Sequence, residues 1–543
     1  MRVMRAAFLV HLLHCASQFP EHSRFVRALR DARTAQREVL ARLLAASEQT
    51  DFGREHGLSR SWTAEDVASR LPVTGWPDWA PWVERQLVEP SRAVLAPGCV
   101  RFEPTSGSTS QRKWIPYSTT FLSELDRAAS PWLFDVARRH PGILRGRHYW
   151  SLSWLPDELR NPPGGKAVTG NDLELLSPWK RRLLGHVMAV PPKVARLPSV
   201  DETLFETLVA LSAAEDLSLV SVWSPTFLLE LLRRLGEERL RIAGRLDGAG
   251  QPRRAGMLRS WDGTASAGFL VGFWPALRLV SAWNTGSSAG WASSVAALLP
   301  QAAFQGKGIW ATEGVVTIPF RGHYPLAVTS HFYEFRCLAD GTVVPPWKLE
   351  PGMEVQPVLS TGSGLWRYAL EDRLRVTGFL ESAPCLEFVA RLSGTDLVGE
   401  KLDASLAQGI LEALQAELPL RCVALLARVP RPGSRELPHY VLLAGPESGA
   451  RGSVRKPTGD AMSIQAAAAQ AAEVRLSAIH HYGLARQLGQ LGPAQAIVVA
   501  DPLAEYFRHT GDGTSGQGSR KVEPVALWSE DIVAGRSGSR NPE

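Results

Sequence analysis

The spacing of apolar residues predicts helices near the start of the chain. Residues 34–48 carry apolar side chains at helical spacing and charged side chains on the opposite face, which is typical of an amphipathic helix. Residues 6–13 form a shorter apolar run behind two arginines, which is also the pattern of a signal peptide. Because His11 and His14 interrupt this run and no Ala-x-Ala site follows, the pattern favours a first helix of the fold.

Further along, short apolar segments alternate with amphipathic ones. Strands are predicted at 217–222 and 277–282, and helices at 226–235 and 292–299. Strands that alternate with helices along a chain indicate an α/β layered fold. The segment 76–82, rich in tryptophan and proline, is predicted to be a loop whose tryptophans pack rather than bind a ligand.

The last third of the chain predicts two further groups of elements. Strand character recurs at 331–337, 355–359 and 374–379. After about residue 395 the composition shifts, and the predicted order becomes helix, strand, strand, helix at 402–418, 421–429, 439–443 and 463–476. We therefore expect two domains, residues 1–395 and a small α+β module at 396–543. The polar tail from Gly535 is expected to be disordered.

Composition narrows the class of protein. The 543 residues are 45% hydrophobic and 21% charged, as in a soluble globular protein. The net charge is +6, but no basic stripe interleaved with aromatic residues exists, so no nucleic-acid partner is expected. Five scattered cysteines without a Cys-x-x-Cys pair argue against a disulfide framework or zinc cluster and fit the cytoplasm. No apolar stretch reaches the ~20 residues of a spanning helix, so no membrane partner is expected either.

The densest chemical signal is the hydroxyl-rich segment 105–113, TSGSTSQRK. Small residues let backbone N–H groups approach an anion, hydroxyl groups add donors, and Lys113 adds a positive charge. These are the requirements of a phosphate-binding loop, although the segment lacks the Gly-Lys-Ser/Thr ending of a Walker A loop. A solvated serine-rich turn has the same composition, so both interpretations stay open.

A second pattern is Gly-x-Ser-x-Gly at 286–290, between a predicted strand and a predicted helix. That is the context of a nucleophile elbow, and Asp372 with His480 or His481 follows in the order of a hydrolase triad. The pattern is short, and the chain holds 47 glycines, so a tight strand-to-helix turn explains it better. A serine hydrolase that uses Ser288 is therefore the alternative function.

Three further segments carry residues that suit a nucleotide. Thr312 and Glu313 follow a strand-like run, where a carboxylate beside a hydroxyl suits Mg²⁺ on a nucleotide. Asp372 ends a turn, where an acidic side chain suits the hydroxyl groups of a ribose. A glycine loop near the C-terminus ends in Lys521. Taken singly, a helix cap or a surface turn would explain each of them.

In this order the five segments resemble the adenylate-forming, firefly luciferase-like superfamily. The closer resemblance is to the acyl acid amido synthetase family, known in plants as auxin-responsive proteins, in its bacterial branch. The resemblance covers nearly the whole chain, from about residue 36 to residue 521. The motifs that carry it are co-linear and lie at 36–40, 50–53, 71–73, 82–84, 105–113, 305–308, 311–314, 365–372, 376–379, 388–391 and 399–401.

The resemblance implies contacts with ATP at matching positions. The phosphates would lie on the loop residues Ser106, Gly107, Ser108, Thr109 and Ser110, with Lys113 as their cation. Thr312 and Glu313 would face the nucleotide, with Glu313 as the Mg²⁺ contact. Asp372 would hold the ribose hydroxyl groups, and Arg391 would support that contact.

The resemblance also implies roles outside the nucleotide site. Lys401 would lie at the pivot between the domains, and Lys521 would be the lysine that the mobile C-terminal domain carries into the site. The acyl pocket would be walled by Trp223, Ser224, Thr285 and Gly286, which reassigns the Gly-x-Ser-x-Gly stretch to a pocket wall.

The fold implied is α/β, with a large N-terminal adenylate-forming domain and a small mobile α+β C-terminal domain. The activity implied is a two-step ligase that adenylates a carboxylic acid with ATP and Mg²⁺ and then transfers the acyl group to an amine, such as an amino acid. We expect a cytoplasmic monomer. Two alternatives remain: the serine hydrolase, and a member of the family that binds nucleotide or acid without turnover.

Overall fold

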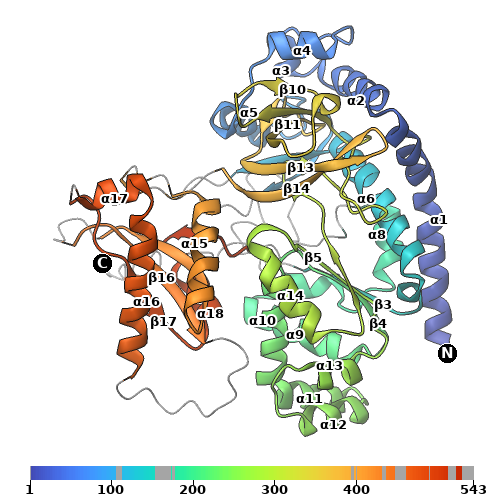
Figure 1. Ribbon diagram of the computed structural model, residues 1–543. Helices are drawn as coiled ribbons and strands as arrows, with labels where there is room; N and C mark the ends of the chain where they lie inside the picture. Colours follow the sequence, from blue (N-terminus) through green and yellow to red (C-terminus); the bar gives the residue numbers. More distant parts are fainter. Residues whose placement is uncertain are drawn as a thin grey trace, which may run out of the picture. The chain divides into compact units, whose positions relative to one another are not determined.

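The computed structural model describes most of the chain. The described residues are 2–104, 113–152, 173, 176, 178–392, 395, 397–398, 400, 402–430, 436–446, 460–487, 489–510 and 521–528. They form two compact units, one that ends at Phe388 and one that begins at Val389 (Figure 1). The tail from Gly535, which was expected to be disordered, lies outside the described residues.

The first unit opens with two long helices, α1 (Arg2–Arg30) and α2 (Ala32–Ser47). Figure 1 shows them end to end along one side of this unit. The break between them is set by Asp31, whose side chain accepts the backbone N–H of Thr34 at 3.0 Å and so caps α2. Both helices predicted from the apolar spacing are therefore confirmed.

The predicted loop at 76–82 is wrong, because this segment begins helix α5 (Trp76–Val88). Pro77 lies in the first turn, where a missing N–H breaks no helical hydrogen bond. Asp78 accepts the N–H of Gly75 at 2.8 Å, which closes the first turn. Trp79 and Val83, one turn apart, are buried in the core, so tryptophan packing stabilises a helix in this segment. The expectation that these tryptophans pack in the core holds for Trp79.

A parallel sheet forms the centre of the first unit. Its strands lie in the order β3 (Arg147–Trp150), β4 (Leu217–Ser221), β5 (Leu279–Ala282) and β6 (Ala303–Gly306). Strands β4 and β5 are buried along their whole length, as in parallel sheets covered by helices on both faces. The helices between these strands include α9 (Val200–Ala213), α10 (Pro225–Glu237) and α14 (Ala289–Leu298). The α/β layering predicted for this region is confirmed.

A second, antiparallel sheet lies later in the first unit. Its main path is β10 (Val343–Val344), β9 (Phe332–Cys337), β11 (Glu354–Ser360), β13 (Asp372–Leu380) and β14 (Ala383–Arg391), and β12 (Tyr368–Ala369) pairs with β11. Two hairpins complete the strands of this unit, β1 (Cys99–Pro104) with β2 (Trp114–Ser118), and β7 (Trp310–Ala311) with β8 (Gly314–Val315). The three strands predicted between residues 331 and 379 are confirmed.

Helix α6 (Thr119–Arg139) covers one face of the parallel sheet and begins at the end of β2. Ser118 caps it by accepting the N–H of Phe121 at 3.0 Å. The shorter helices of this unit are α3 (Asp51–Glu55), α4 (Ala64–Arg70), α8 (Pro178–Gly185), α11 (Arg239–Gly248), α12 (Pro252–Ser260) and α13 (Ala267–Phe273). Single 3₁₀ turns occur at Pro141–Arg145, Pro192–Arg196, Gly286–Ser288 and Pro346–Lys348.

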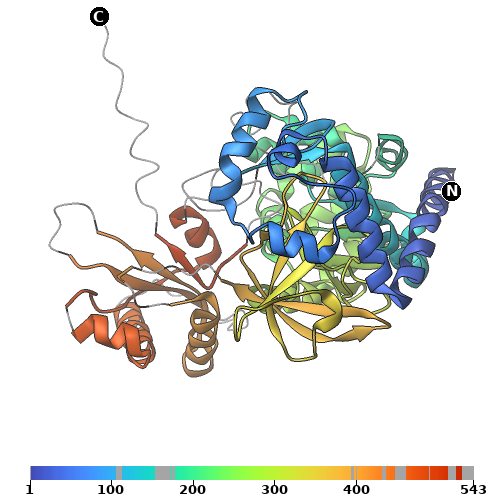
Figure 2. The same cartoon turned by 90° about the horizontal axis from the view of Figure 1, so that it is seen from above.

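The second unit is a small α+β domain. It contains α15 (Ala404–Glu417), β15 (Leu420–Arg428), β16 (His439–Pro446), α16 (Asp460–Ser477), α17 (His480–Gln487), β17 (Gln495–Val498), α18 (Pro502–His509) and β18 (Val525–Leu527). Its sheet has the order β17-β16-β15-β18. Figure 2 shows α18, in red, on the opposite side of this sheet from α15 and α16. The predicted order of helix, strand, strand and helix is confirmed.

None of the helices in the described part of the chain is both long enough and apolar enough to span a lipid bilayer.

Candidate active site

The turn between β7 and β8 brings two of the predicted motifs together. Thr312 and Glu313 occupy this turn. The hydroxyl of Tyr117 donates to the carbonyl oxygen of Thr312 at 3.1 Å, and the hydroxyl of Tyr368 donates to Oε1 of Glu313 at 3.4 Å. The Glu313 carboxylate is therefore tied to the segment 365–368, which precedes Asp372.

Close packing around Gly314 fixes the course of the same turn. A Cβ atom at Gly314 would lie 2.7 Å from Cδ2 of Leu359 and 3.1 Å from Nε2 of His331, which leaves no room for a side chain. Glycine therefore lets β8 pass against the buried sheet without displacing these two side chains. Because Gly314 packs closely against Leu359 and His331, the backbone position of the preceding residue, Glu313, is fixed as well.

Arg367 holds the segment that carries Tyr368. Its guanidinium makes two hydrogen bonds with the carboxylate of Glu334, at 2.8 and 2.9 Å, and donates to the carbonyl oxygens of Ala68 and Leu71. Arg367 adopts a φ of 50°, which is unusual for a residue other than glycine. Local strain of this kind persists only where the surroundings impose it, and it is common at functional sites.

A buried pair of side chains, Glu124 and His331, lies next to the same turn. Oε2 of Glu124, on α6, lies 2.8 Å from Nδ1 of His331 and accepts the N–H of Gly362 at 2.8 Å. Ser118 donates to the carbonyl oxygen of Gly362 at 2.5 Å. The start of α6 is therefore fixed to the segment that leads into the Tyr368 motif.

Of the other residues predicted to contact the nucleotide, the structure describes Asp372, Lys113 and Arg391 but not those of the hydroxyl-rich loop. Asp372 begins β13 and is half-buried. Lys113 directly precedes β2, with its Nζ 6.0 Å from the ring centroid of Trp76. Arg391 ends β14 in the second unit, with Nε 4.0 Å from a carboxylate oxygen of Glu523. The loop residues Ser106, Gly107, Ser108, Thr109 and Ser110, and also Lys401, lie outside the described residues.

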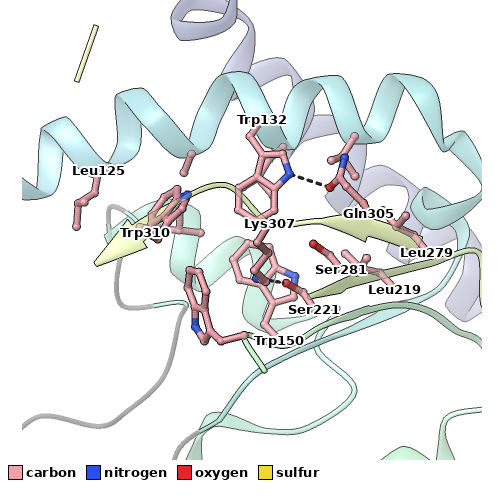
Figure 3. A pocket seen from close by; sticks show the side chains of 15 residues that line it. Leu125, Trp132, Trp150, Leu219, Ser221, Leu279, Ser281, Gln305, Lys307 and Trp310 are labelled. Carbon is pink, nitrogen blue, oxygen red and sulfur yellow. Dashed lines mark hydrogen bonds between the residues drawn. The ribbon is translucent and has the colours of Figure 1, made fainter. Parts of the chain in front are cut away.

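A pocket lies between α6 and one face of the parallel sheet (Figure 3). Its floor consists of alternate residues on three adjacent strands, which share one face because side chains alternate along a strand. The floor residues are Leu219, Ser221, Leu279, Ser281, Gln305 and Lys307. Helix α6 supplies residues on one helical face, among them Trp132, and the tryptophans Trp150, Trp223 and Trp310 line the remaining walls.

Lys307 places a cation in this largely apolar pocket. The residue is 6% exposed, and its Nζ donates to Oγ of Ser221 at 2.9 Å. The ammonium lies 4.1 Å from the ring centroid of Trp223 and 5.2 Å from that of Trp132. Aromatic rings at these distances stabilise a cation electrostatically. Trp132 is held in turn by a hydrogen bond from Nε1 to Oε1 of Gln305 at 3.0 Å.

Of the residues predicted to wall an acyl pocket, Trp223 lines this pocket, whereas Ser224, Thr285 and Gly286 do not belong to its lining. Ser224 is buried beside Thr226, and their hydroxyl oxygens are 2.6 Å apart. Gly286, at a φ of 55°, begins the 3₁₀ turn that leads from the end of β5 into α14. Ser288 is the last residue of this turn, as expected for a strand-to-helix connection.

The pocket residues were largely missed by the sequence analysis. Lys307 falls inside the recognised motif 305–308, and Trp310 directly precedes the motif 311–314, but neither received a role. A signal for them was available in the sequence. Ser221, Ser281 and Lys307 are polar residues at the carboxyl ends of three short apolar strands, and the carboxyl ends of parallel strands commonly form ligand sites.

Comparison with known proteins assigns the chain to a family. Residues 21–304 match the model of the GH3 family N-terminal domain, and residues 324–391 match that of the GH3 family central domain. A probable indole-3-acetic acid-amido synthetase, GH3.12 of Oryza sativa subsp. japonica, is 25% identical over 442 residues, 68% of this chain and 70% of the relative. A probable indole-3-acetic acid-amido synthetase of Arabidopsis thaliana, GH3.1, is 24% identical over 74% of each protein.

Solved structures agree on the fold. The GH3.15 acyl acid amido synthetase in complex with 2,4-DB superposes with a TM-score of 0.77, at 18% identity, over 94% of both chains. A second structure of GH3.15 gives a TM-score of 0.75 over 93% of both chains.

The predicted large α/β domain with a smaller C-terminal domain is confirmed, and the serine hydrolase alternative finds no support. The assignment to a bacterial branch stays a prediction. The model of the N-terminal domain alone covers more than half of the residues of this chain. The chain therefore belongs to the GH3 family, that of the acyl acid amido synthetases.

Proposed function

We propose that the protein is an ATP-dependent ligase that joins a carboxylic acid to an amine, such as an amino acid, through an acyl-adenylate. The observation that supports this most directly is the segment 310–313. Trp310 lines the apolar pocket, while Thr312 and Glu313, two and three residues later, occupy the motif expected to face the nucleotide. One short segment thus joins a site for an apolar acid to a site for ATP.

In the first half-reaction, a carboxylate oxygen of the acid attacks the α-phosphorus of ATP, and the bond to the pyrophosphate breaks. Negative charge accumulates on the phosphoryl oxygens in the transition state, so cations and N–H donors aimed there lower the barrier. Lys113, which follows the hydroxyl-rich loop, would supply such a cation. Asp372 would orient the nucleotide by accepting hydrogen bonds from the ribose hydroxyl groups.

The Glu313 carboxylate suits Mg²⁺ bound to the phosphates. In the described part of the chain, no three acidic, histidine or cysteine side chains gather into a cage for a metal. Mg²⁺ at nucleotide sites needs no such cage, because it is bound by one or two carboxylates together with phosphate oxygens and water. The hydrogen bond from Tyr368 fixes the orientation of this carboxylate. When bound, the ion neutralises charge on the leaving pyrophosphate.

In the second half-reaction, the amine attacks the acyl carbonyl carbon, and AMP leaves. We propose that the small C-terminal domain moves between the two steps. A domain rotation of this kind excludes water and lets one site perform two reactions in succession. Lys401 at the pivot and Lys521 on the moving domain are the residues proposed to act through this motion.

The test is exchange of labelled pyrophosphate into ATP in the presence of Mg²⁺ and a panel of carboxylic acids, without an amine. We expect exchange with at least one acid, and we expect Glu313→Gln to reduce it by about 100-fold. Glu350→Gln, a change at an exposed glutamate, serves as the matched control and should leave exchange unchanged. Absence of exchange with every acid would support the alternative of a member that binds without turnover.

A further inference from the structure

Two residues that line the tryptophan-lined pocket also belong to a separate apolar cluster. Leu176 and Trp150 line the pocket, and both pack in a cluster with Ala7 and Val10 of α1 and Leu184 of α8. We call these five residues the α1–α8 cluster. Ala7 and Leu176 are both buried. One wall of the pocket and the first helix of the chain therefore share a packed core.

Helix α1 is fixed beside this wall by contacts with β3. Nε2 of His11 lies 3.0 Å from the carbonyl oxygen of Gly146, and the rings of His11 and His148 stack with their centroids 4.1 Å apart. His11 follows Ala7 by four positions, so the two residues share one face of the helix. Trp150 ends the strand that carries His148. The same strand thus holds both α1 and a residue of the pocket wall.

Helix α8 is fixed to α6, which forms another wall of the pocket. Nζ of Lys180 lies 2.7 and 2.8 Å from the two carboxylate oxygens of Asp126 and donates to Oγ of Ser130 at 3.1 Å. Asp126 and Ser130 directly follow Leu125 and Ala129, which line the pocket. Helices α1 and α8 lie side by side (Figure 1). Fixed elements therefore surround the α1–α8 cluster, and its volume limits where Leu176 and Trp150 can lie.

We infer that helix α1 sets the size of the acid pocket, with Ala7 and Val10 as positioning residues that act through Leu176 and Trp150. Protein interiors are close-packed and transmit strain, so a wall residue shifts when the volume of the side chains packed against it changes. This inference rests on the proposed function and adds what determines the length of acid that the site accepts.

The residues assigned to this role lie outside the recognised domain. The match to the model of the GH3 family N-terminal domain begins at residue 21, whereas Ala7 and Val10 precede it. The size of the acid is thus assigned to a segment of this chain that the family match does not include.

The experiment measures pyrophosphate exchange with two homologous series, unbranched acids from butanoic to decanoic acid and ω-phenylalkanoic acids from phenylacetic to 5-phenylpentanoic acid. One methylene in an apolar pocket changes kcat/KM by about 10-fold or more, so each series measures the length of the pocket. Val10→Ala removes volume from the cluster. Relative to the preferred acid of the wild type, it should favour the next longer acid by about 3-fold. Ala7→Val adds volume and should favour the next shorter acid by about the same factor.

Two further variants calibrate these shifts. Leu176→Ala removes part of the wall itself and should shift the preference towards longer acids more than Val10→Ala does. Val209→Ala is the matched control, because Val209 is also a partly buried valine on a helix, α9. It packs against a cluster that, in the described part of the chain, shares no residue with the pocket lining, so the preferred acid should stay the same.

Opposite shifts in Val10→Ala and Ala7→Val distinguish control of pocket size from a loss of stability, which would lower kcat/KM for every acid alike. The order in which the acids raise the Tm without ATP should shift in the same way, and this readout needs no turnover. If neither variant changes the preferred acid, the inference is overturned and the proposed function stays intact. If the wild type shows exchange with no acid, the proposed function itself is contradicted.

Discussion

The hydroxyl of Tyr368 donates a hydrogen bond of 3.4 Å to Oε1 of Glu313, between residues that are 55 positions apart in the sequence. This contact joins the two segments that the sequence analysis assigned separately to the nucleotide and to its ribose. Tyr368 is itself fixed on β12 through its pairing with Leu359 on β11. The orientation of the proposed metal-binding carboxylate thus depends on the antiparallel sheet.

Tyr368→Phe should lower kcat/KM for ATP in the pyrophosphate exchange assay by about 10-fold. A hydrogen bond to a charged group contributes about 1.5–3 kcal/mol at normal length, and at 3.4 Å this one lies at the low end of that range or below it. Its loss leaves the Glu313 carboxylate less well oriented. Tyr482→Phe is the matched control, since that tyrosine also donates to a glutamate, Glu473, at 2.8 Å in the second unit. An equal effect of both variants on kcat/KM would show that the Tyr368 hydroxyl acts only through stability.

Asp372→Ala should raise the KM for ATP at least about 10-fold and leave the KM for the acid nearly unchanged. A ribose diol needs an acceptor, and a carboxylate makes strong charge-assisted hydrogen bonds. Glu371→Ala tests specificity, because this neighbouring carboxylate is exposed. Steady-state kinetics with ATP and acid varied in turn provide the measurement. If both KM values rise together, Asp372 has a structural role.

Arg367→Met should reduce the free energy of unfolding by about 3–5 kcal/mol, because it leaves the buried Glu334 carboxylate without its guanidinium. The double variant Arg367→Met, Glu334→Met should recover part of this loss, since no uncompensated charge remains. Arg375→Met, which breaks an exposed pair with Glu354, should cost under about 1 kcal/mol. Urea unfolding curves measure the free energy of unfolding of each variant. The prediction is wrong if Arg367→Met and Arg375→Met are equally stable.

A cluster of buried histidines on and beside α1 predicts acid sensitivity. Burial lowers the pKa of His14 to about 3, with the charge of Lys180 acting in the same direction. Burial also lowers the pKa values of His11 and of His148, whose rings stack 4.1 Å apart. These groups are neutral in the folded protein but titrate near 6.5 when it unfolds. Their contribution to stability is therefore complete above pH 6.5 and is lost as the pH falls below it.

For His14 alone, the free energy of unfolding should be about 2 kcal/mol lower at pH 5 than at pH 7.5. Urea unfolding at pH 7.5 and pH 5 measures it, and His14→Gln should weaken the pH dependence by about that amount. His323→Gln changes an exposed histidine and should leave the pH dependence as in the wild type. The prediction is wrong if His14→Gln and the wild type lose stability equally on acidification.

The order of the motifs could be predicted from sequence, but their contacts could not. Asp372 and Glu313 stand in segments with a distinctive order of residue types, so the resemblance identified them. The contact of Glu313 with Tyr368 depends on the register of β12 against β11, which no local pattern encodes. Lys307 was missed because its neighbours in space, Ser221 and Trp223, come from a strand about 85 residues earlier.

The error at 76–82 has a local cause. A cluster of prolines is typical of a loop, but Pro77 lies in the first turn of α5, where proline is well tolerated. Pro81 lies inside the helix, where a proline costs a backbone hydrogen bond, so the packing of the helix must offset that cost. The helix that forms there is stabilised by burial of Trp79 against the core, a tertiary effect that a single-sequence pattern does not include.

Lys521 begins a segment that the second unit holds in place. The residue is half-buried, and two positions later the N–H of Glu523 donates to the hydroxyl of Tyr506, on α18, at 3.0 Å. The segment then continues into β18, which pairs with β15. A lysine fixed to a compact domain in this way moves with that domain as a unit.

We therefore predict that Lys521→Ala slows formation of the acyl-adenylate by at least about 100-fold, because its ammonium would neutralise the α-phosphate as the acid attacks. Attack of the amine on chemically supplied acyl-adenylate should be affected far less, since that step no longer develops charge on a transferring phosphoryl group. Lys193→Ala, at an exposed lysine, provides the control. Rapid-quench measurement of each half-reaction separates the two steps. An unchanged rate of adenylation in the Lys521 variant would remove this residue from the proposed mechanism.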